Sequence, residues 1–530
     1  MSSASASSSP LGSHSLPAQP SIRQLQVQAK ELAAELKARK PDALARFERV
    51  LGRIPPAASS GNELKLSDAQ LILSREYGCD NWAALTRKVD EILAATVTPE
   101  QIEELKRAIE SGGKEGAASL KAVLQKYPGL KSKLNEPLFG FGSVALLEAV
   151  RQQNREMIDV LLEAGADINR RSDWAPGSFG VLDNIDSDLA DFLIERGAVV
   201  DVHAAAGHAK ISRLKELLDA NPALVNARGG DGGTPMHFAR NVEVAQLLLD
   251  RGADVHIRDL DHGSTAAMWQ VKNRPILDLL IAAGSPVDIY MACYHGDRAL
   301  AERALHENPK CLGYVIAHNE GDGEFAQDTG GNIYNWTIGH AARPIPLALQ
   351  RGHRELAEWL LTKATPAQRF VALCFDGQES AARDVFQRHP EMVAEMTEND
   401  RRALPQAIHF GNIAAARLMI ELGFPLDVPE LFDRGTLLHS AAWHGRADLV
   451  RTLVARRPEW LENKDNNHES TPLGWACHGS LHCWGRGNGD YAGTVQAMID
   501  GGKDLTELDL EEADQWAAPE VVAVLRKSRK

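Results

Sequence analysis

A segment of about 33 residues recurs along most of this sequence, and this recurrence limits the possible folds more than any other feature. Residues 233–259 are its clearest copy. Thr234 and Pro235 are typical of a helix start, because a threonine side chain accepts a free amide there and proline at the first helical position loses no hydrogen bond. Apolar residues follow at helical spacing, and Gly252 is placed to end a second helix with positive φ. Neither helix is long enough to bury its own apolar face, so each copy must pack against its neighbours.

Glycines show how regular the recurrence is. Those expected to end a second helix lie 32 residues apart in two pairs, Gly165 with Gly197 and Gly252 with Gly284. Those expected between the two helices of a copy lie 34 residues apart, at Gly377, Gly411 and Gly445. With Thr-Pro-x-His opening the first helix and Gly-Ala-Asp closing the second, the chain resembles the ankyrin repeat family over about residues 100–505. The resemblance implies an all-α fold, an ankyrin-repeat solenoid of helix-turn-helix pairs with finger loops.

Length, charge and cysteine usage narrow the class of protein. A chain of 530 residues is too long for one compact core but ordinary for a solenoid. The formal net charge of −14 argues against nucleic acid or an anionic membrane as the main partner, and no apolar run approaches the length that spans a membrane. Six scattered cysteines do not form a disulfide framework, so we expect a reducing, cytoplasmic location.

The chain divides by composition and pattern into four predicted parts. Residues 1–20 are expected to be a disordered tail, and residues 21–94 a small helical module. Residues 95–505 are expected to hold about eleven or twelve repeats, several of them degenerate, and residues 506–530 a closing helix. Thr98 with Gln101, and Ser67 with Gln70, have the spacing of a capping box at a helix start. Asp80 or Asn81 is expected to cap the module's last helix.

The helical module has two readings. The patterns at Ala29–Leu32 and Leu66–Leu85 resemble an N-terminal module found ahead of ankyrin repeats in bacterial proteins, and the chain is similar to that bacterial subgroup. As a cap, the module would cover the apolar end of the array. As an alternative, residues 22–36 carry an apolar stripe that would let two copies associate weakly.

Histidines and threonines at the helix starts are expected to be structural. His237 and His439 occupy the Thr-Pro-x-His position, where the resemblance implies hydrogen bonds to the backbone between repeats. A lone imidazole without an orienting partner is a poor candidate for a catalytic base. Leu437 replaces the proline in one copy, while Met268 and Gly474 replace the histidine in two others, so packing must hold those copies. The predicted structural set comprises Thr234, Pro235, His237, Gly252, Thr436, His439, Thr471 and Pro472.

Two insertions interrupt the period, at residues 314–336 and 479–491. The densest group of soft metal ligands lies beside the second, but Gly479 is expected to end the helix there and no second ligand pair follows, so these are weak candidates only: Cys477, His478, His482 and Cys483. The acidic residues of the first insertion fit no calcium loop and are expected to be a solvated acidic surface: Glu320, Asp322, Glu324 and Asp328, with His318 beside them. We therefore expect no metal and no cofactor.

The resemblance implies a non-enzymatic scaffold that binds a partner protein through a concave face and finger loops. Fingertip side chains are expected to be free of folding duties, and Trp174 is the strongest candidate because exposed aromatic residues often anchor interfaces. The predicted partner-binding residues are Arg171, Asp173, Trp174, Arg228, Asp231, Arg258, Asp261, His262, Lys464, Asn466 and His468. The alternative is an enzyme, or a metal or ligand sensor, that uses one of the two insertions. The sequence does not identify the partner.

Overall fold

The computed structural model of the chain describes residues 14–17, 20–56, 64–94, 97–175, 177–318, 326–327, 332–431, 435–506 and 513–529. Their regular structure is helical apart from two short parallel strands, β1 (Ala317–His318) and β2 (Ala326–Gln327). The chain forms two compact units. Unit 1 comprises Met1–Leu224 with Arg228–Gly232, and unit 2 comprises Val225–Ala227 with Gly233–Lys530. Among the described helices, none has the length and apolar character needed to cross a bilayer.

Unit 1 begins with the predicted helical module. Its helices are α1 (Ile22–Lys37), α2 (Pro41–Leu51), α3 (Leu66–Glu76) and α4 (Trp82–Ala94). The Asn81 side chain accepts the Ala84 amide at 2.9 Å, so Asn81 caps α4 as expected. The prediction that Ser67 caps α3 is wrong. Helix α3 begins at Leu66, two residues earlier than a cap at Ser67 implies, and the Asp68 carboxylate accepts the Lys65 amide at 2.9 Å.

The apolar stripe of α1 is buried inside the module. Leu32 is 3% exposed and Leu36 fully buried, in a core shared with Phe47 of α2 and Ile72 of α3. From the sequence, an alternative role for this stripe, within residues 22–36, is the weak association of two copies. In the structure Leu32 and Leu36 pack against the module's own helices, while Val27 of α1 is 48% exposed. Whether two copies associate through this helix stays a prediction.

The rest of unit 1 consists of paired helices. They are α5 (Pro99–Glu110), α6 (Gly113–Lys126), α7 (Ala145–Arg151), α8 (Arg155–Ala164), α9 (Ser187–Glu195), α10 (Val202–Gly207) and α11 (Ile211–Ala220). Short 3-10 turns lie between them at η1 (Pro128–Lys133) and η2 (Gly140–Gly142) and after them at η4 (Gly230–Gly232), while η3 (Pro222–Asn226) has its first three residues in unit 1 and its last two in unit 2. The expected capping box at Thr98 and Gln101 is present at the start of α5.

Unit 2 continues the pairs. Its α-helices are α12 (Val242–Asp250), α13 (Ala266–Trp269), α14 (Arg274–Ala282), α15 (Ile289–His295), α16 (Arg298–Glu307), α17 (Tyr334–Thr337), α18 (Pro344–Gln350), α19 (Arg354–Lys363), α20 (Pro366–Phe375), α21 (Glu379–Arg388), α22 (Met392–Glu395), α23 (Glu398–Arg401), α24 (Ala403–His409), α25 (Ile413–Glu421), α26 (Leu437–Trp443), α27 (Ala447–Arg456), α28 (Pro472–His482), α29 (Tyr491–Asp500), α30 (Ala513–Trp516) and α31 (Pro519–Ser528). The 3-10 turns are η5 (Cys311–Gly313), η7 (Pro458–Glu462) and η8 (Arg486–Asn488).

The clearest sequence copy has a shorter first helix than expected. Residues 235–238 form a single turn, while the second helix, α12, is complete and is capped by Asn241. Gly252 has φ of +87°, which agrees with its predicted role after that helix.

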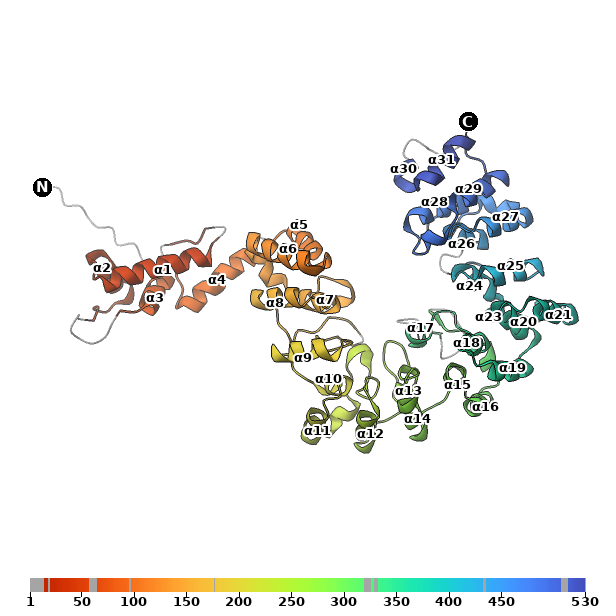
Figure 1. Cartoon of the computed structure of the whole chain (residues 1–530). Coiled ribbons are helices and arrows are strands. Elements are labelled where there is room, and N and C mark those ends of the chain that lie inside the picture. Colours follow the sequence, from red (N-terminus) through yellow and green to blue (C-terminus); the bar gives the residue numbers. More distant parts are fainter. Residues whose placement is uncertain are drawn as a thin grey trace. The chain divides into compact units, whose positions relative to one another are not determined.

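Inner and outer helices form two rows near the end of unit 2. Figure 1 shows α24, α26 and α28 in one row and α25, α27 and α29 in the other. One cluster of buried apolar residues extends from Ala367 to Leu525 and passes between them. Helix α31 buries Val521, Val522 and Leu525 in this cluster. It lies within residues 506–530, and its role as a closing helix stays a prediction.

Gly479 does not end a helix, contrary to expectation; α28 runs through it to His482. The reason is a close helix contact, because a Cβ atom at Gly479 would lie 2.4 Å from the carbonyl oxygen of Trp443 on α26. Glycine at this position therefore lets two inner helices approach, and the second insertion begins only after α28.

Of the first insertion, the structure describes residues 314–318, 326–327 and 332–336. Its acidic residues Glu320, Asp322, Glu324 and Asp328 lie outside the described residues. Its C-terminal end is fixed to earlier repeats of unit 2. The Tyr334 hydroxyl donates to Asp288 at 2.7 Å, and the Ile333 amide donates to the Ser264 hydroxyl at 3.2 Å.

Candidate functional site

Two finger loops of unit 2 are held by the same arrangement of side chains. In the later loop, the Asp465 carboxylate accepts the amides of His468 at 2.6 Å and Ser470 at 3.1 Å, and the indole N–H of Trp475 at 2.8 Å. Burial raises the pKa of Asp465, but the hydrogen bonds from His468, Trp475 and Ser470 outweigh it and leave the pKa below its usual value. The loop is thereby tied to the start of α28.

The earlier loop repeats this pattern 206 residues before it in the sequence. Asp259 accepts the His262 amide at 2.6 Å and the indole N–H of Trp269. Each loop thus has an aspartate that orders its own backbone and fixes a tryptophan of the following inner helix. These tryptophans are placed by hydrogen bonds rather than by packing alone.

The two Thr-x-x-His histidines have their expected structural role. The His237 and His439 rings lie 3.0 Å from the amides of Thr234 and Thr436, and their other nitrogens lie 3.1 Å from the carbonyl oxygens of Ser264 and Ser470. Each ring therefore links one repeat to the next finger loop. Both histidines are almost fully buried.

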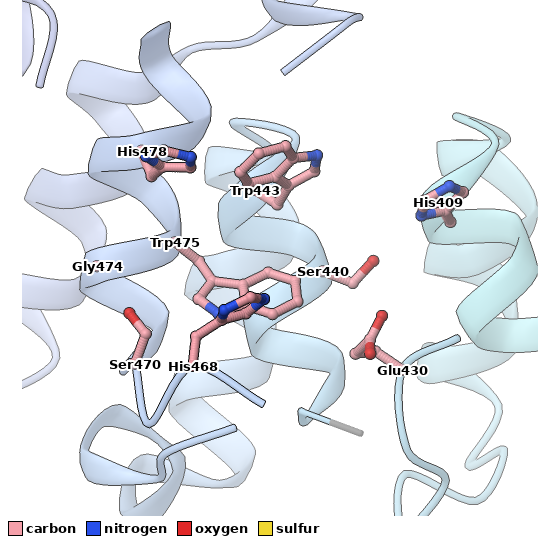
Figure 2. Close-up of a pocket in the computed structure, with 9 residues that line it drawn as sticks. All are labelled: His409, Glu430, Ser440, Trp443, His468, Ser470, Gly474, Trp475 and His478. Atoms are coloured by element: carbon pink, nitrogen blue, oxygen red, sulfur yellow. The ribbon is translucent and has the colours of Figure 1, made fainter. Parts of the chain in front are cut away.

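A pocket of about 560 Å³ lies where these finger loops meet the inner helices of unit 2. Helices α24, α26 and α28 and the loops before α26 and α28 supply its lining: His409, Glu430, Ser440, Trp443, His468, Ser470, Gly474, Trp475 and His478. Figure 2 shows the indoles of Trp443 and Trp475 on one side and Glu430 and His409 on the other. Pockets of this size commonly hold a small molecule or part of a peptide.

Two histidines of this pocket, His409 and His478, have lowered pKa values. Burial, followed by the neighbouring His340, lowers the pKa of His409 to about 4. The pKa of His478 is also lowered, first by burial and then by His482 and His468. At neutral pH these two rings therefore carry no charge, and the only acidic residue of the described lining is Glu430, which is 4% exposed.

Beside the pocket, His444 departs from a pattern found in other repeats. At the end of other inner helices, His208 and His295 bond a carbonyl oxygen of the preceding repeat. His444 instead lies 3.4 Å from the His409 ring and 3.5 Å from the Cys483 sulfur. Burial, then His409 and Arg446, lower the pKa of His444 to about 4. The His444 ring beside His409 and Cys483 is therefore neutral at neutral pH.

The four weak metal candidates do not form one site. Cys477 is buried in α28, which raises the pKa of its thiol to about 12. The His478 and His482 rings lie 4.3 Å apart, whereas Cys483 turns toward His444. Among the described residues, no group of three or more histidine, cysteine, aspartate or glutamate side chains has the geometry to hold a metal ion.

The predicted finger residues differ in exposure. Asp173, Arg228, Lys464, Asn466 and His468 are exposed, and Arg171, Trp174 and Arg258 are half-buried. Asp231, Asp261 and His262 are at most 8% exposed. The expectation that fingertip side chains are free of folding duties is therefore wrong for these three. Whether any of the eleven residues contacts a partner stays a prediction.

Trp174 forms an aromatic pair on the surface of unit 1. Its ring lies 4.9 Å from that of Phe141 in an edge-to-face arrangement, and Phe141 is 70% exposed. The Asp173 amide donates to the Gly142 carbonyl at 2.9 Å, which joins the two loops. Phe141 has φ of +57°, an uncommon conformation for a bulky residue. The sequence indicated Trp174 but not Phe141.

The pocket residues Glu430, Trp443 and Trp475 were also missed. One signal was present, since His409 and Trp443 lie 34 residues apart at the ends of successive inner helices. Polar and aromatic residues that recur at the repeat period on a face that need not be buried are candidates for binding. Glu430 gives no such signal, because only the fold of its loop brings it to the pocket.

The sequence model of the ankyrin repeat matches residues 141–173 and 231–260. The first segment lies in unit 1, and most of the second lies in unit 2. These matches show that both segments contain ankyrin repeats, and the paired helices and the histidine links between repeats agree with them. The helical structure with these repeats is that of an all-α ankyrin-repeat solenoid.

Characterised relatives share only parts of the chain. Ankyrin repeat and SAM domain-containing protein 6 of Rattus norvegicus is 31% identical over 20% of this chain and 14% of its own length. B-cell lymphoma 3 protein of Homo sapiens is 35% identical over 20% of this chain and 25% of its own. Putative ankyrin repeat protein FPV230 of fowlpox virus (strain NVSL) is 28% identical over 28% of this chain and 80% of its own. These relatives are mammalian and viral, so the bacterial affiliation stays a prediction.

Proposed function

We propose that this chain is a non-enzymatic scaffold that binds a partner protein through the concave face of its inner helices and through its finger loops. Three successive inner helices, α24, α26 and α28, and two finger loops supply side chains to one pocket. That arrangement carries the proposal, because a surface built from several repeats fits an extended partner better than a reaction centre. The described lining of the pocket contains no lysine or arginine. It also contains no nucleophile that is oriented by a neighbouring base.

The exposed aromatic residues around the pocket support the same function. Trp484 is 72% exposed and Phe410 43% exposed, and both rings lie within 6.0 Å of the His409 ring. Large aromatic side chains that are left in water are typical anchors of protein interfaces. The exposed finger residues Lys464, Asn466 and His468 would form the polar rim beside them.

Photo-crosslinking from defined positions tests this function. A photoreactive phenylalanine analogue replaces His478, which is exposed in the pocket, or Arg388, which is exposed on the outer helix α21. In extracts of the source cells, we expect a discrete adduct from position 478 that excess unlabelled chain suppresses. Adducts of equal yield from position 388, or none from 478, would contradict the proposal.

The proposed scaffold function also suggests a role for the helical module and a cellular compartment for the chain. The helical module, residues 21–94, caps the N-terminal end of the array. The six described cysteines are free and buried, which suits a reducing compartment such as the cytoplasm.

A further inference from the structure

We propose that His478 and His482 of α28 together bind a divalent transition-metal ion, Zn²⁺ or Cu²⁺, through their imidazole rings. The two histidines lie one helical turn apart, and the centroids of their rings are 4.3 Å apart. Side chains four residues apart lie on the same face of an α-helix, which is the spacing that helical metal sites use for two histidine ligands. The metal site does not depend on the proposed scaffold function.

The course of α28 makes this pair possible. The sequence pattern predicts that Gly479 ends the helix between the two histidines, which would separate their side chains. In the structure α28 continues through Gly479 and ends at His482, so both histidines belong to one helix. The glycine is required for the contact with α26, where a Cβ atom would lie 2.4 Å from the Trp443 carbonyl oxygen. One of the two reasons for expecting no metal at this helix is thereby removed.

The fold does not use the nitrogens of these two rings. His237 makes contacts through both ring nitrogens, and His295 bonds a carbonyl oxygen. Within the described residues, by contrast, neither the His478 nor the His482 imidazole makes a hydrogen bond or an ion pair. Each lies against another ring, and His478 is 5.7 Å from Trp443 (Figure 2). Both histidines are exposed, so their nitrogens are accessible to an ion from solution.

The protonation state of the pair suits a metal ligand. A metal ion binds imidazole in its neutral form, because the proton and the metal compete for the same lone pair. Burial, followed by His482 and His468, lowers the pKa of His478 below its ordinary value. His478 is therefore neutral at physiological pH and has no proton to release when a metal binds.

The ligand set defines the kind of site. In the described part of the chain, no group of three or more histidine, cysteine, aspartate or glutamate side chains could hold a metal ion, so the pair is not a closed structural site. It is an open site with two protein ligands, whose other positions take water. Imidazole ligands suit zinc and copper, with Cu²⁺ bound more tightly than Zn²⁺, whereas Mg²⁺ and Ca²⁺ require oxygen ligands.

The test uses the purified full chain without a histidine tag, treated with EDTA and returned to metal-free buffer. Isothermal titration calorimetry measures Zn²⁺ binding, and pulsed EPR counts the imidazole nitrogens bound to added Cu²⁺. The variants are His478→Gln, His482→Gln and the double substitution. His306→Gln on α16 is the matched control, because His306 is an exposed helical histidine with no other histidine one turn away.

We expect saturable Zn²⁺ binding by the wild type and a Cu²⁺ signal with two imidazole nitrogens. Each single substitution should weaken Zn²⁺ binding by about tenfold or more, since the loss of a ligand costs at least as much as the loss of a residue that supports one. The double variant should bind no more weakly than the single variants, because one remaining imidazole cannot chelate. His306→Gln should keep the wild-type affinity.

The proposal is overturned if the wild type shows no saturable Zn²⁺ binding, or if His306→Gln loses as much affinity as His478→Gln. It is also overturned if Cu²⁺ binds one imidazole only and each single variant keeps half of the binding, which would indicate two independent histidines. Thermal unfolding of the metal-free variants checks the fold. Because both histidines are exposed, the melting temperatures should match that of the wild type, so that weaker binding reports the loss of a ligand.

Discussion

At the scale of single residues, Gly479 shows how one position sets a helix contact. A side chain there would meet the Trp443 backbone at 2.4 Å, and a backbone cannot rotate away as a side chain can. We expect Gly479→Ala to lower the free energy of unfolding by about 1–3 kcal/mol, the usual cost of overpacking. Thermal unfolding measures it. Gly487→Ala is the matched control, since nothing lies within 4 Å of a Cβ there; an equal loss in both variants would refute the explanation.

His444 gives the chain a specific dependence on pH. Its pKa is about 4 in the folded chain and near 6.5 when unfolded, so the unfolded chain takes up a proton first as the pH falls. The contribution of neutral His444 is complete above pH 6.5 and is lost as the pH falls toward 4, by about 3 kcal/mol for a shift of this size.

We therefore expect His444→Gln to flatten the decline of melting temperature between pH 6.5 and pH 4. Glutamine is the natural alternative, because Gln152 and Gln270 occupy the end of inner helices in other repeats and bond carbonyl oxygens there. His256→Gln, at an exposed residue, should keep the wild-type decline. A slope that His444→Gln leaves unchanged would show that other groups control the acid response.

Sequence reasoning at this scale succeeded where the role is local. The roles of His237 and Gly252 follow from a few neighbouring residues, and the structure confirms both. Gly479 was misread because the reason for that glycine lies 36 residues away, at the backbone of Trp443. Asp261 and His262 were misplaced for a similar reason, since only the folded loop turns them inward.

At the scale of elements, α31 matters because it contributes buried side chains to the core of unit 2. Leu525 is fully buried in the cluster that extends back to Ala367. We expect Leu525→Ala to lower the stability of unit 2 by about 2–5 kcal/mol, as for other buried leucines. Urea unfolding followed by tryptophan fluorescence measures the change. Lys527→Ala, two residues on and exposed, should stay within 0.5 kcal/mol of the wild type; a comparable loss there would indicate that the whole helix is fragile.

Elements were predictable where capping residues and apolar spacing agree, as at Thr98 for α5 and Asn81 for α4. They were less predictable where tertiary contacts decide. Residues 235–238 form one turn rather than a helix although Thr234 and Pro235 have the pattern of a helix start. The pocket lies at this second level, because Glu430 reaches it through a loop whose sequence carries no motif.

At the scale of the whole molecule, the period of the sequence determined the fold class, while the site depended on which copies departed from that period. The two matched segments contain the shared pattern, but His444, Trp443 and Glu430 lie outside both. The sequence pattern shared by a repeat family consists of the residues that every repeat requires for stacking. Residues that bind a partner are not required for stacking and do not belong to this pattern. They could therefore be identified only in the structure.

Repeat architecture also predicts how damage spreads through the chain. Because each repeat contacts mainly its neighbours, stability is close to a sum of local terms, and a defect at one end is felt most by the elements beside it. The core cluster that contains Leu525 is confined to residues 367–525, whereas α1–α3 bury a separate cluster. We expect amide hydrogen exchange in Leu525→Ala to rise strongly in α29 and α31, less in α26 and α27, and not at all in α1–α3. The comparison is made peptide by peptide on the full chain, with Lys527→Ala as the unchanged reference. A uniform rise across both clusters would mean that the chain unfolds as one cooperative body, and the account of stability by neighbouring repeats would then be wrong.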